Sequence, residues 1–337
     1  MTVTRWGIIA PGRIAHTFTQ DLRLVPDAEL AAVGSRSLDR AEAFAREYDI
    51  ARAYGSYADL LADPGVDAVY IASPHALHVG QVTAALEAGK HVLCEKPLTL
   101  RASDAEALFA LAVRHERLLM EAMWTACHPV IRDLARRLRA GEFGTPRQLH
   151  AELGFVVDTQ PTDRLLDVDM GAGALLDMGI YPLTFAHLML GEAERLTGSA
   201  VVTDAGVDLD IAVAGRYPGD AVATLTASMT SWSSRRAEIA TDRGRLVLED
   251  FHHPTEVTYT PTAVGGTNDD VDRGRSVVVE CAEPVIGRGY AHEAIELQRC
   301  LAEGLLESPL LPHAQTLTIL RQMDELRAQV GVRYAGD

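Results

Sequence analysis

The turn at residues 10–15 (APGRIA) has the residue types that bind a phosphate group. It lies between the apolar run Arg5–Ala10 and a run of helical length, and it matches G-x-G-x-x-A except that Ala10 replaces the first glycine. Gly12 lets the backbone approach a pyrophosphate, and the start of the helix supplies unpaired N–H groups. An ordinary strand-to-helix turn can also use glycine, but the position of this one predicts a dinucleotide site with contacts from Ala10, Pro11, Gly12, Arg13 and Ile14.

The residues after the next apolar run, Glu29–Ser35, indicate which dinucleotide would bind. An acidic side chain at this strand tip would bind the ribose 2′-hydroxyl of NAD, but the sequence reads Gly34-Ser35-Arg36-Ser37, with Arg40 nearby. Hydroxyl and guanidinium groups suit a 2′-phosphate, so Ser35, Arg36 and Arg40 favour NADP over NAD. The alternative is that both arginines are solvated charges at the start of a helix.

A third segment, Ser73-Pro74-His75-Ala76-Leu77-His78, follows the strand-like run Asp67–Ala72. Ligands of open α/β sheets bind at the carboxyl ends of the strands, so we expect cofactor contacts here. The H-x-x-H spacing alone is weak evidence for a metal, because no third ligand accompanies it, and we predict no metal site. The expected cofactor contacts in this segment are Ser73, Pro74, His75 and His78.

The tripeptide Glu95-Lys96-Pro97 directly follows the run His91–Cys94 and contains the candidate for proton transfer. At the sheet edge beside a nicotinamide, Lys96 would be partly desolvated and close to the cationic ring of the oxidised cofactor. Both effects disfavour the charged ammonium, which suits the lysine for exchanging a proton with a substrate hydroxyl. A surface lysine is the weaker interpretation of a lysine in this position.

The segment Gly171–Pro182 (GAGALLDMGIYP) carries a further pair of reactive side chains. If it is helical, Asp177 and Tyr181 lie one turn apart on one face. A carboxylate can orient a sugar hydroxyl and a tyrosine can pass a proton, although the same residues also serve as helix caps and core packing. Pro182 removes a backbone hydrogen bond to Met178 and predicts a kink.

A parallel sheet would bring the first four motifs to one edge. Residues 1–123 alternate short apolar runs with amphipathic runs of helical length, which is typical of a parallel sheet with helices on both faces. We therefore predict an α/β Rossmann domain, a doubly wound parallel sheet, over residues 1–123.

Residues 124–337 have a different pattern. Apolar side chains alternate with polar or small ones over Val207–Val213 and Ala221–Met229, which is typical of antiparallel strands with one packed and one solvated face. Two helical runs, Tyr290–Leu305 and Leu317–Gln329, close the chain. We predict an α+β domain with a large, mostly antiparallel open sheet for substrate binding and dimerisation, and we expect the C-terminal helix to pack back on the first domain.

Composition excludes several classes of protein. The 337 residues carry 31 Lys and Arg against 47 Asp and Glu, a net charge of −16, which disfavours nucleic acid and anionic membranes as partners. No uninterrupted apolar run approaches the roughly 20 residues of a membrane helix, and no secretory signal is recognisable. The four cysteines include no close pair of the kind that holds structural zinc. We expect a cytoplasmic protein with reduced thiols.

Taken in order, these motifs resemble the Gfo/Idh/MocA oxidoreductase family over nearly the whole chain. Glu95-Lys96-Pro97 is the most specific mark. Three further segments resemble the branch that contains dimeric trans-dihydrodiol dehydrogenases and NADP-dependent D-xylose dehydrogenases, namely Glu121–Thr125 (EAMWT), Gly171–Pro182 and Gly289–Glu293 (GYAHE).

The resemblance implies roles for individual residues. Lys96 would be the catalytic lysine, and Asp177 and Tyr181 would face the substrate. Many members carry histidine at the position of Tyr181, so proton transfer here falls to the tyrosine, the lysine or both. Ala10 and Pro11 depart from the family pattern in the phosphate turn, and Ala172 stands where relatives often have glycine. The resemblance also implies cofactor contacts from Glu95, Lys96, Trp124, Arg164 and Tyr290.

The same resemblance implies a homodimer formed through the open sheet. We expect the apolar face of Val207–Val213 and Ala221–Met229 to supply that interface.

We therefore predict an NADP-dependent dehydrogenase or reductase that moves a hydride between nicotinamide C4 and a secondary alcohol or ketone. Its substrate would be a sugar, a cyclic polyol or a dihydrodiol. One alternative is an enzyme that holds its cofactor tightly and uses transient oxidation for glycoside cleavage or dismutation. Another is a non-catalytic NADP-binding regulatory protein, against which the joint presence of Lys96, Asp177 and Tyr181 argues. A carbohydrate-binding module would leave the phosphate turn unexplained.

Overall fold

The computed structural model describes residues 3–157, 164–262 and 275–334, and the chain forms two compact units. The first unit comprises Met1–Cys127 with Ile286–Leu320, and the second comprises His128–Val285 with Arg321–Asp337. Residues of helix α9 (Ala291–Ala302) therefore belong with the first unit, and helix α10 (His313–Val330) contributes to both. The domain limits of 1–123 and 124–337 stay a prediction.

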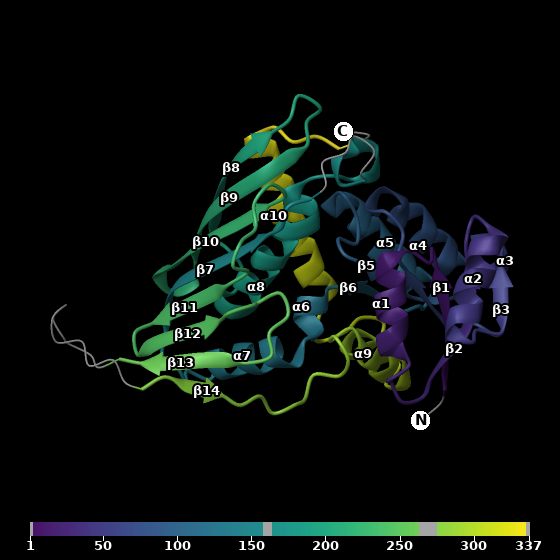
Figure 1. The fold of residues 1–337 in the computed structure, drawn as a ribbon, viewed down its shortest axis with the longest axis horizontal. Coiled ribbons are helices and arrows are strands. Elements are labelled where there is room, and N and C mark those ends of the chain that lie inside the picture. The colour runs from purple at the N-terminus through teal and green to yellow at the C-terminus, as the bar shows by residue number, and fades with distance from the viewer. Residues whose placement is uncertain (1–2, 158–163, 263–274, 335–337) are drawn as a thin grey trace. The chain divides into compact units, whose positions relative to one another are not determined.

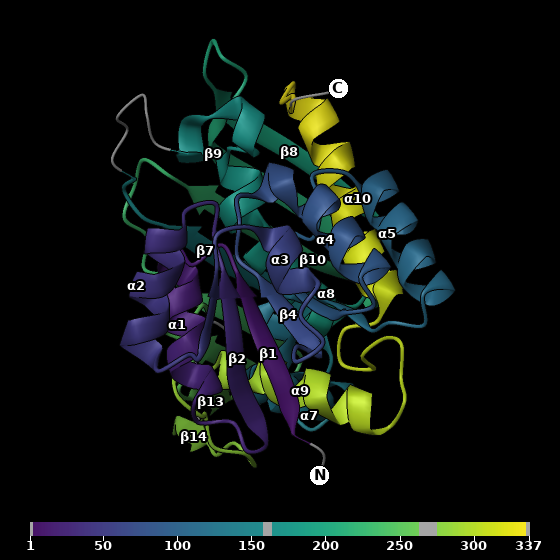
Figure 2. The same cartoon turned by 90° about the vertical axis from the view of Figure 1, so that its right-hand side faces the viewer.

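The first unit is built on a six-stranded sheet in the order β3-β2-β1-β4-β5-β6. Its neighbouring strands β2, β1 and β4 are labelled in Figure 2. Each pair of neighbouring strands is parallel. This confirms the predicted doubly wound parallel sheet. The strands are β1 (Thr4–Ile9), β2 (Ala28–Gly34), β3 (Arg52–Tyr54), β4 (Ala68–Ile71), β5 (His91–Glu95) and β6 (Leu119–Ala122).

Helices cover both faces of this sheet. The alternation of side chains along β1 sends Trp6 and Ile8 into one core and Ile9 into the other. Burial of such side chains stabilises the fold by about 1.5–3 kcal/mol each. The first core is closed by α1 (Arg13–Leu22), α2 (Leu38–Tyr48) and α9, and the second by α3 (Tyr57–Leu61), α4 (His78–Glu87) and α5 (Ala102–Arg114).

The second unit contains an eight-stranded sheet in the order β14-β13-β12-β11-β7-β10-β9-β8 (Figure 1). Of its paired neighbours among the described residues, β10 and β7 are parallel and the others are antiparallel, which confirms the predicted open sheet. The strands are β7 (Pro146–Gly154), β8 (Arg195–Val202), β9 (Asp208–Tyr217), β10 (Ala221–Ser228), β11 (Ala237–Thr241), β12 (Gly244–Leu248), β13 (Val257–Pro261) and β14 (Val277–Val279).

One face of the second sheet is packed, as predicted, and it lies against helix α8 (Ile180–Leu190). Along β10, Ala223 and Leu225 are buried whereas Val222 and Thr224 are exposed. The expectation that the apolar face of β9 and β10 forms a dimer interface is wrong, because those side chains are already buried within the unit. The alternation also placed Asp208 on the solvated face, but Asp208 is completely buried.

One stretch of the described residues, Val168–Leu190, is long and apolar enough to cross a membrane. However, 83% of its most apolar window is buried inside the fold, and the core helix of a globular protein has the same composition. The described residues contain no disulfide bond. The remaining α-helices of the described residues are α6 (Trp124–Cys127) and α7 (Pro129–Arg139).

Candidate active site

The turn between β1 and α1 has the geometry of a phosphate site. Ala10 adopts φ 64°, the left-handed region that glycine enters without steric cost, which explains why a glycine is usual at this position. Gly12 is the N-cap of α1 and no side chain caps the helix. A Cβ atom placed on Gly12 would meet no atom closer than 3.8 Å, so the space before the helix is open. An uncapped helix start with open space in front of it fits a pyrophosphate group.

Backbone hydrogen bonds bring three strand ends together at this turn. The Ala10 N–H donates to the Gly34 carbonyl at the end of β2 at 3.1 Å. On the other side, the Ala72 N–H after β4 donates to the Ile9 carbonyl at 3.1 Å. The strand order reverses direction between β1 and β4, which is where open α/β sheets bind nucleotides. Pro11 and Ile14 are half-buried in the turn, and Arg13 is exposed.

The tip of β2 carries cations without acidic partners. Arg36 and Arg40 are exposed, and neither has an ion-pair partner among the residues described here. Ser35 is buried, and its hydroxyl accepts a hydrogen bond from the Ser37 N–H at 3.3 Å. This arrangement fits a 2′-phosphate, which needs positive charge and hydroxyl donors.

The turn after β4 is fixed by His78, which is fully buried. One ring nitrogen lies 2.9 Å from the Ser73 carbonyl oxygen, and the other lies 3.0 Å from the Pro97 carbonyl oxygen. Burial lowers the pKa of His78. Because both ring nitrogens face carbonyl groups, His78 joins the Ser73 turn to the turn after β5 and acts on a cofactor only through them. Pro74 and His75 lie in the same turn, and the His75 ring is 5.8 Å from the His78 ring.

Lys96 is buried at the carboxyl end of β5, with 9% of its surface exposed. Lys90 is the only other lysine in the sequence, and its ammonium donates to the Asp63 and Val66 carbonyls at 2.7 and 2.8 Å, so it has a structural role. Glu95, beside Lys96, accepts a hydrogen bond from the hydroxyl of Tyr70.

The turn that follows Lys96 is anchored by Glu121, a residue of β6. The Glu121 carboxylate accepts from the Leu98 N–H and from the Thr316 hydroxyl, both at 2.9 Å. Burial raises the pKa of Glu121, and the positive charge of Lys96 opposes that effect. Glu121 therefore positions the turn that follows Lys96, although it lies outside the tripeptide Glu95-Lys96-Pro97.

Trp124 and Tyr290 are brought together by a short strap of residues 286–290. The Trp124 indole N–H donates to the Arg288 carbonyl at 3.2 Å, and the rings of Trp124 and Tyr290 lie 6.2 Å apart. Asp21 on α1 holds the other side of the strap, because its carboxylate accepts from the Arg288 and Tyr290 N–H groups at 2.8 and 2.9 Å. A side chain at Gly289 would come within 2.8 Å of the indole, so glycine is required there.

A buried carboxyl group lies behind this strap. Glu293 on α9 is fully buried, and neither of its carboxylate oxygens has a hydrogen-bond partner in the described part of the chain. Burial raises the pKa of Glu293 well above its usual value, and the nearby charge of Glu95 adds to the effect. Burial therefore favours the neutral form of the Glu293 carboxyl group.

The segment Gly171–Pro182 lies in the second unit and is helical from Ala174 onward. It begins with a wide π-helical turn, Leu175–Gly179, that continues into α8. The wide turn ends at Gly179, three residues before Pro182, which has no N–H to donate back to Met178. Tyr181 is buried, and Asp177 is half-buried.

Asp208 holds the start of this wide turn. Its carboxylate accepts from the Leu175 N–H at 2.6 Å, and a side chain at Gly173 would come within 2.1 Å of the other carboxylate oxygen. Burial raises the pKa of Asp208 to about 6. The ring of Tyr181 packs edge-on against His252, with ring centres 4.5 Å apart. Arg164 begins the short helix Arg164–Leu166, but its side chain lies outside the described residues.

Sequence reasoning did not assign roles to Asp21, Glu121, Asp208 or His252. Each acts through a partner that is distant in the sequence, so no local motif contains both. The only local signals were Gly173 and Gly289, which leave room for the Asp208 carboxylate and the Trp124 indole.

Comparison with known proteins decides the family. The model of the Gfo/Idh/MocA family, described as "Oxidoreductase family, NAD-binding Rossmann fold", matches residues 4–123. The model of the family's C-terminal domain matches residues 131–247. The trans-1,2-dihydrobenzene-1,2-diol dehydrogenase of Mus musculus is 34% identical over 345 residues, covering 99% of this chain and 98% of that one. The chain belongs to the Gfo/Idh/MocA family. It is an NAD(P)-dependent oxidoreductase, as predicted.

Further similar proteins agree with this assignment. The trans-1,2-dihydrobenzene-1,2-diol dehydrogenase of Xenopus laevis is 32% identical over 340 residues, covering 98% of this chain and 99% of that one. The 3-ketoreductase KijD10 from Actinomadura kijaniata, solved with NADP and TDP-benzene, has a TM-score of 0.84 and 29% identity over 98% of this chain and 99% of that one. An aldose–aldose oxidoreductase from Caulobacter crescentus has a TM-score of 0.85, covering 97% of each chain, and its 22% identity shows the fold alone.

Proposed function

We propose that this oxidoreductase is NADP-dependent and interconverts a secondary alcohol and its ketone on a small sugar, cyclic polyol or dihydrodiol. The names of the relatives support this substrate class, since they include diol dehydrogenases and a 3-ketoreductase solved with NADP. The observation that carries the proposal is the joint location of three features at the carboxyl edge of one sheet. These are the open turn at Gly12, the cations at the tip of β2 and the buried Lys96.

The first unit would hold the cofactor. When bound, its nicotinamide ring supplies or accepts the hydride. The N–H groups at the start of α1 would bind the pyrophosphate, and Ser35, Arg36 and Arg40 would bind the 2′-phosphate. Trp124 and Tyr290, which are held together by the strap of residues 286–290, would border the nicotinamide pocket.

Lys96 would exchange a proton with the substrate hydroxyl at its Nζ atom. Burial excludes bulk water from its surroundings, and Glu121 fixes the turn that carries it. We assign Asp177 to orienting a substrate hydroxyl and the Tyr181 phenol to a second proton-transfer site. The homodimer and the cytoplasmic location stay predictions.

Kinetics of Lys96 variants test the proposal. Lys96→Met keeps the bulk of the side chain, and Lys96→Arg keeps the charge but cannot release a proton near pH 7. We expect both variants to lose at least about 100-fold in kcat with aldoses or cyclic diols and NADP, because general acid–base catalysis contributes roughly 10²–10⁴-fold. NADPH affinity should change less than about threefold. Turnover close to that of the unchanged protein in either variant would refute the role of Lys96.

A double variant separates the two proton-transfer candidates. If Lys96 and Tyr181 serve one proton, Lys96→Met with Tyr181→Phe should cost less than the sum of the two single losses in activation free energy. Fully additive losses would show that the two residues act independently. The remaining alternatives have distinct signatures: nucleotide retained through purification indicates a tightly held cofactor, and NADPH binding without turnover of any substrate indicates a regulatory protein.

A further inference from the structure

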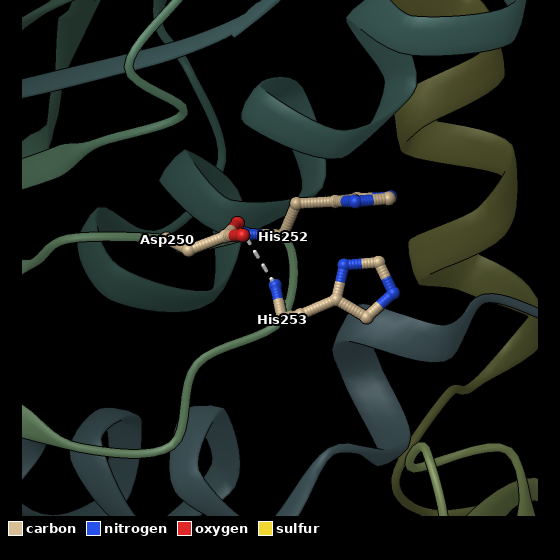
Figure 3. Close-up of side chains that lie close together, drawn as sticks. All are labelled: Asp250, His252 and His253. Atoms are coloured by element: carbon tan, nitrogen blue, oxygen red, sulfur yellow. Dashed lines mark hydrogen bonds between the residues drawn. The ribbon is translucent and has the colours of Figure 1, made fainter.

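Three side chains with metal-binding atoms lie together in the segment between β12 and β13 (Figure 3). Asp250, His252 and His253 each offer one ligand atom, and these atoms all lie within 4.8 Å of one another. Figure 3 shows both imidazole rings extending to the same side of the segment. The two rings meet edge to face, with centres 4.3 Å apart.

The carboxylate of this cluster is held in place by other groups. One oxygen of Asp250 accepts from the N–H groups of His252 and His253 at 3.1 and 3.2 Å. The other oxygen forms an ion pair with the Arg235 guanidinium at 3.0 Å. A carboxylate oxygen has more than one acceptor position, so these contacts leave room for a metal ion. Metal-binding carboxylates are commonly oriented by such outer contacts.

We propose that Asp250, His252 and His253 bind a divalent transition-metal ion, with zinc as the best match. Two imidazoles and one carboxylate suit zinc, which takes three protein ligands at about 2.0–2.2 Å and a water molecule. Magnesium and calcium prefer oxygen ligands and are excluded by the two nitrogens. The His253 side chain is exposed, so a metal ion can reach it from solvent.

The site has a consequence for catalysis because His252 also contacts Tyr181. The two rings meet at 90° with centres 4.5 Å apart. An ion bound to His252 places positive charge and a rigid ring beside the tyrosine phenol. Zinc should therefore inhibit turnover, a consequence that rests on the proposed role of Tyr181.

Calorimetry with zinc chloride tests the site directly. The full chain carrying Cys281→Ser is the parent, because Cys281 is the partly exposed thiol that could bind zinc by itself. We expect one zinc ion per chain, with affinity at least about tenfold lower in His253→Gln and Asp250→Asn. His150→Ala removes an exposed histidine elsewhere in the same unit and should leave the affinity unchanged. Magnesium chloride should give no binding heat.

Equal zinc affinity in the parent and in His253→Gln would overturn the proposal, and so would absence of binding to the parent. Inhibition is measured with each variant normalised to its own rate in zinc-free buffer. Zinc should inhibit the parent at the concentration where it binds, and it should inhibit His253→Gln only at about tenfold higher concentration. Zinc that binds without inhibiting would refute the link to Tyr181. An absence of turnover in zinc-free buffer would instead count against the proposed function, and the calorimetry would still decide the metal site.

Discussion

Asp208 connects the stability of the second unit to pH. Its carboxylate is completely buried, one oxygen accepts from the Leu175 N–H at 2.6 Å, and the other has no hydrogen-bond partner among the described residues. Burial raises the pKa of Asp208 from 3.8 to about 6. The perturbation we consider is Asp208→Asn, which keeps an oxygen for the Leu175 N–H but cannot ionise.

The size of the effect follows from the difference between the two pKa values. One pKa unit corresponds to about 1.4 kcal/mol, so ionised Asp208 costs the folded state about 3 kcal/mol at pH 7. The folded protein holds this proton more tightly than the unfolded chain does. Stability therefore falls as pH rises from about 4 to 6, and the cost is fully present above the folded pKa.

Urea unfolding of both proteins between pH 4 and pH 7 measures this cost. We expect the free energy of unfolding of Asp208→Asn, relative to the unchanged protein, to rise by about 3 kcal/mol over that range. The comparison cancels the contributions of other titrating groups. A difference that does not vary with pH would refute the reasoning. Asp208→Ala leaves the Leu175 N–H without its acceptor, so it should be about 1–3 kcal/mol less stable than Asp208→Asn at every pH, with a lower kcat.

Three further predictions concern the first unit. Glu121→Ala removes the acceptor of the Leu98 N–H, and steady-state kinetics should show at least about a tenfold loss of kcat with unchanged NADPH affinity. Ala10→Gly relieves the residue at φ 64° and should raise the free energy of unfolding, measured in urea, by about 1 kcal/mol. Burial lowers the pKa of His91 from 6.5 to about 4, so stability is lost as pH falls between these values, by about 3 kcal/mol in total. His91→Gln keeps an acceptor for the Leu118 N–H and should flatten that dependence in urea unfolding. A kcat that survives in Glu121→Ala, an Ala10→Gly protein no more stable than its parent, or an unchanged acid dependence in His91→Gln would contradict them.

Local patterns in the sequence were enough to predict the six-stranded sheet of the first unit and the packed face of β9 and β10. The alternation of Trp6, Ile8 and Ile9 between two cores required a strand covered on both faces, and the period-two pattern of β10 required one packed face. The phosphate turn was recognisable despite Ala10, because its place between strand and helix carries the information. These features depend on neighbouring residues, so they can be predicted without the rest of the chain.

Features that depend on distant partners could not be predicted. The pattern put Asp208 on the solvated face, but it is drawn inward because the Leu175 N–H needs an acceptor 33 residues away in the chain. Glu121 holds the lysine turn 23 residues before it, and only the fold brings the two together. The dimer face was misplaced for a related reason. The apolar residues of β10 were recognisable in the sequence, but the packing of α8 against them depends on the fold.

The most direct test of the proposed function is a fluorescence titration with NADPH and NADH. Arg36→Ala and Arg40→Ala are compared with Arg46→Ala, which removes an exposed arginine of α2 that pairs with Glu42. We expect tight NADPH binding and weak NADH binding in the unchanged protein and in Arg46→Ala, and loss of that preference in Arg36→Ala and Arg40→Ala. Equal affinity for both nucleotides in the unchanged protein would contradict the assignment of NADP. Binding of neither nucleotide would contradict the phosphate site at Gly12 itself.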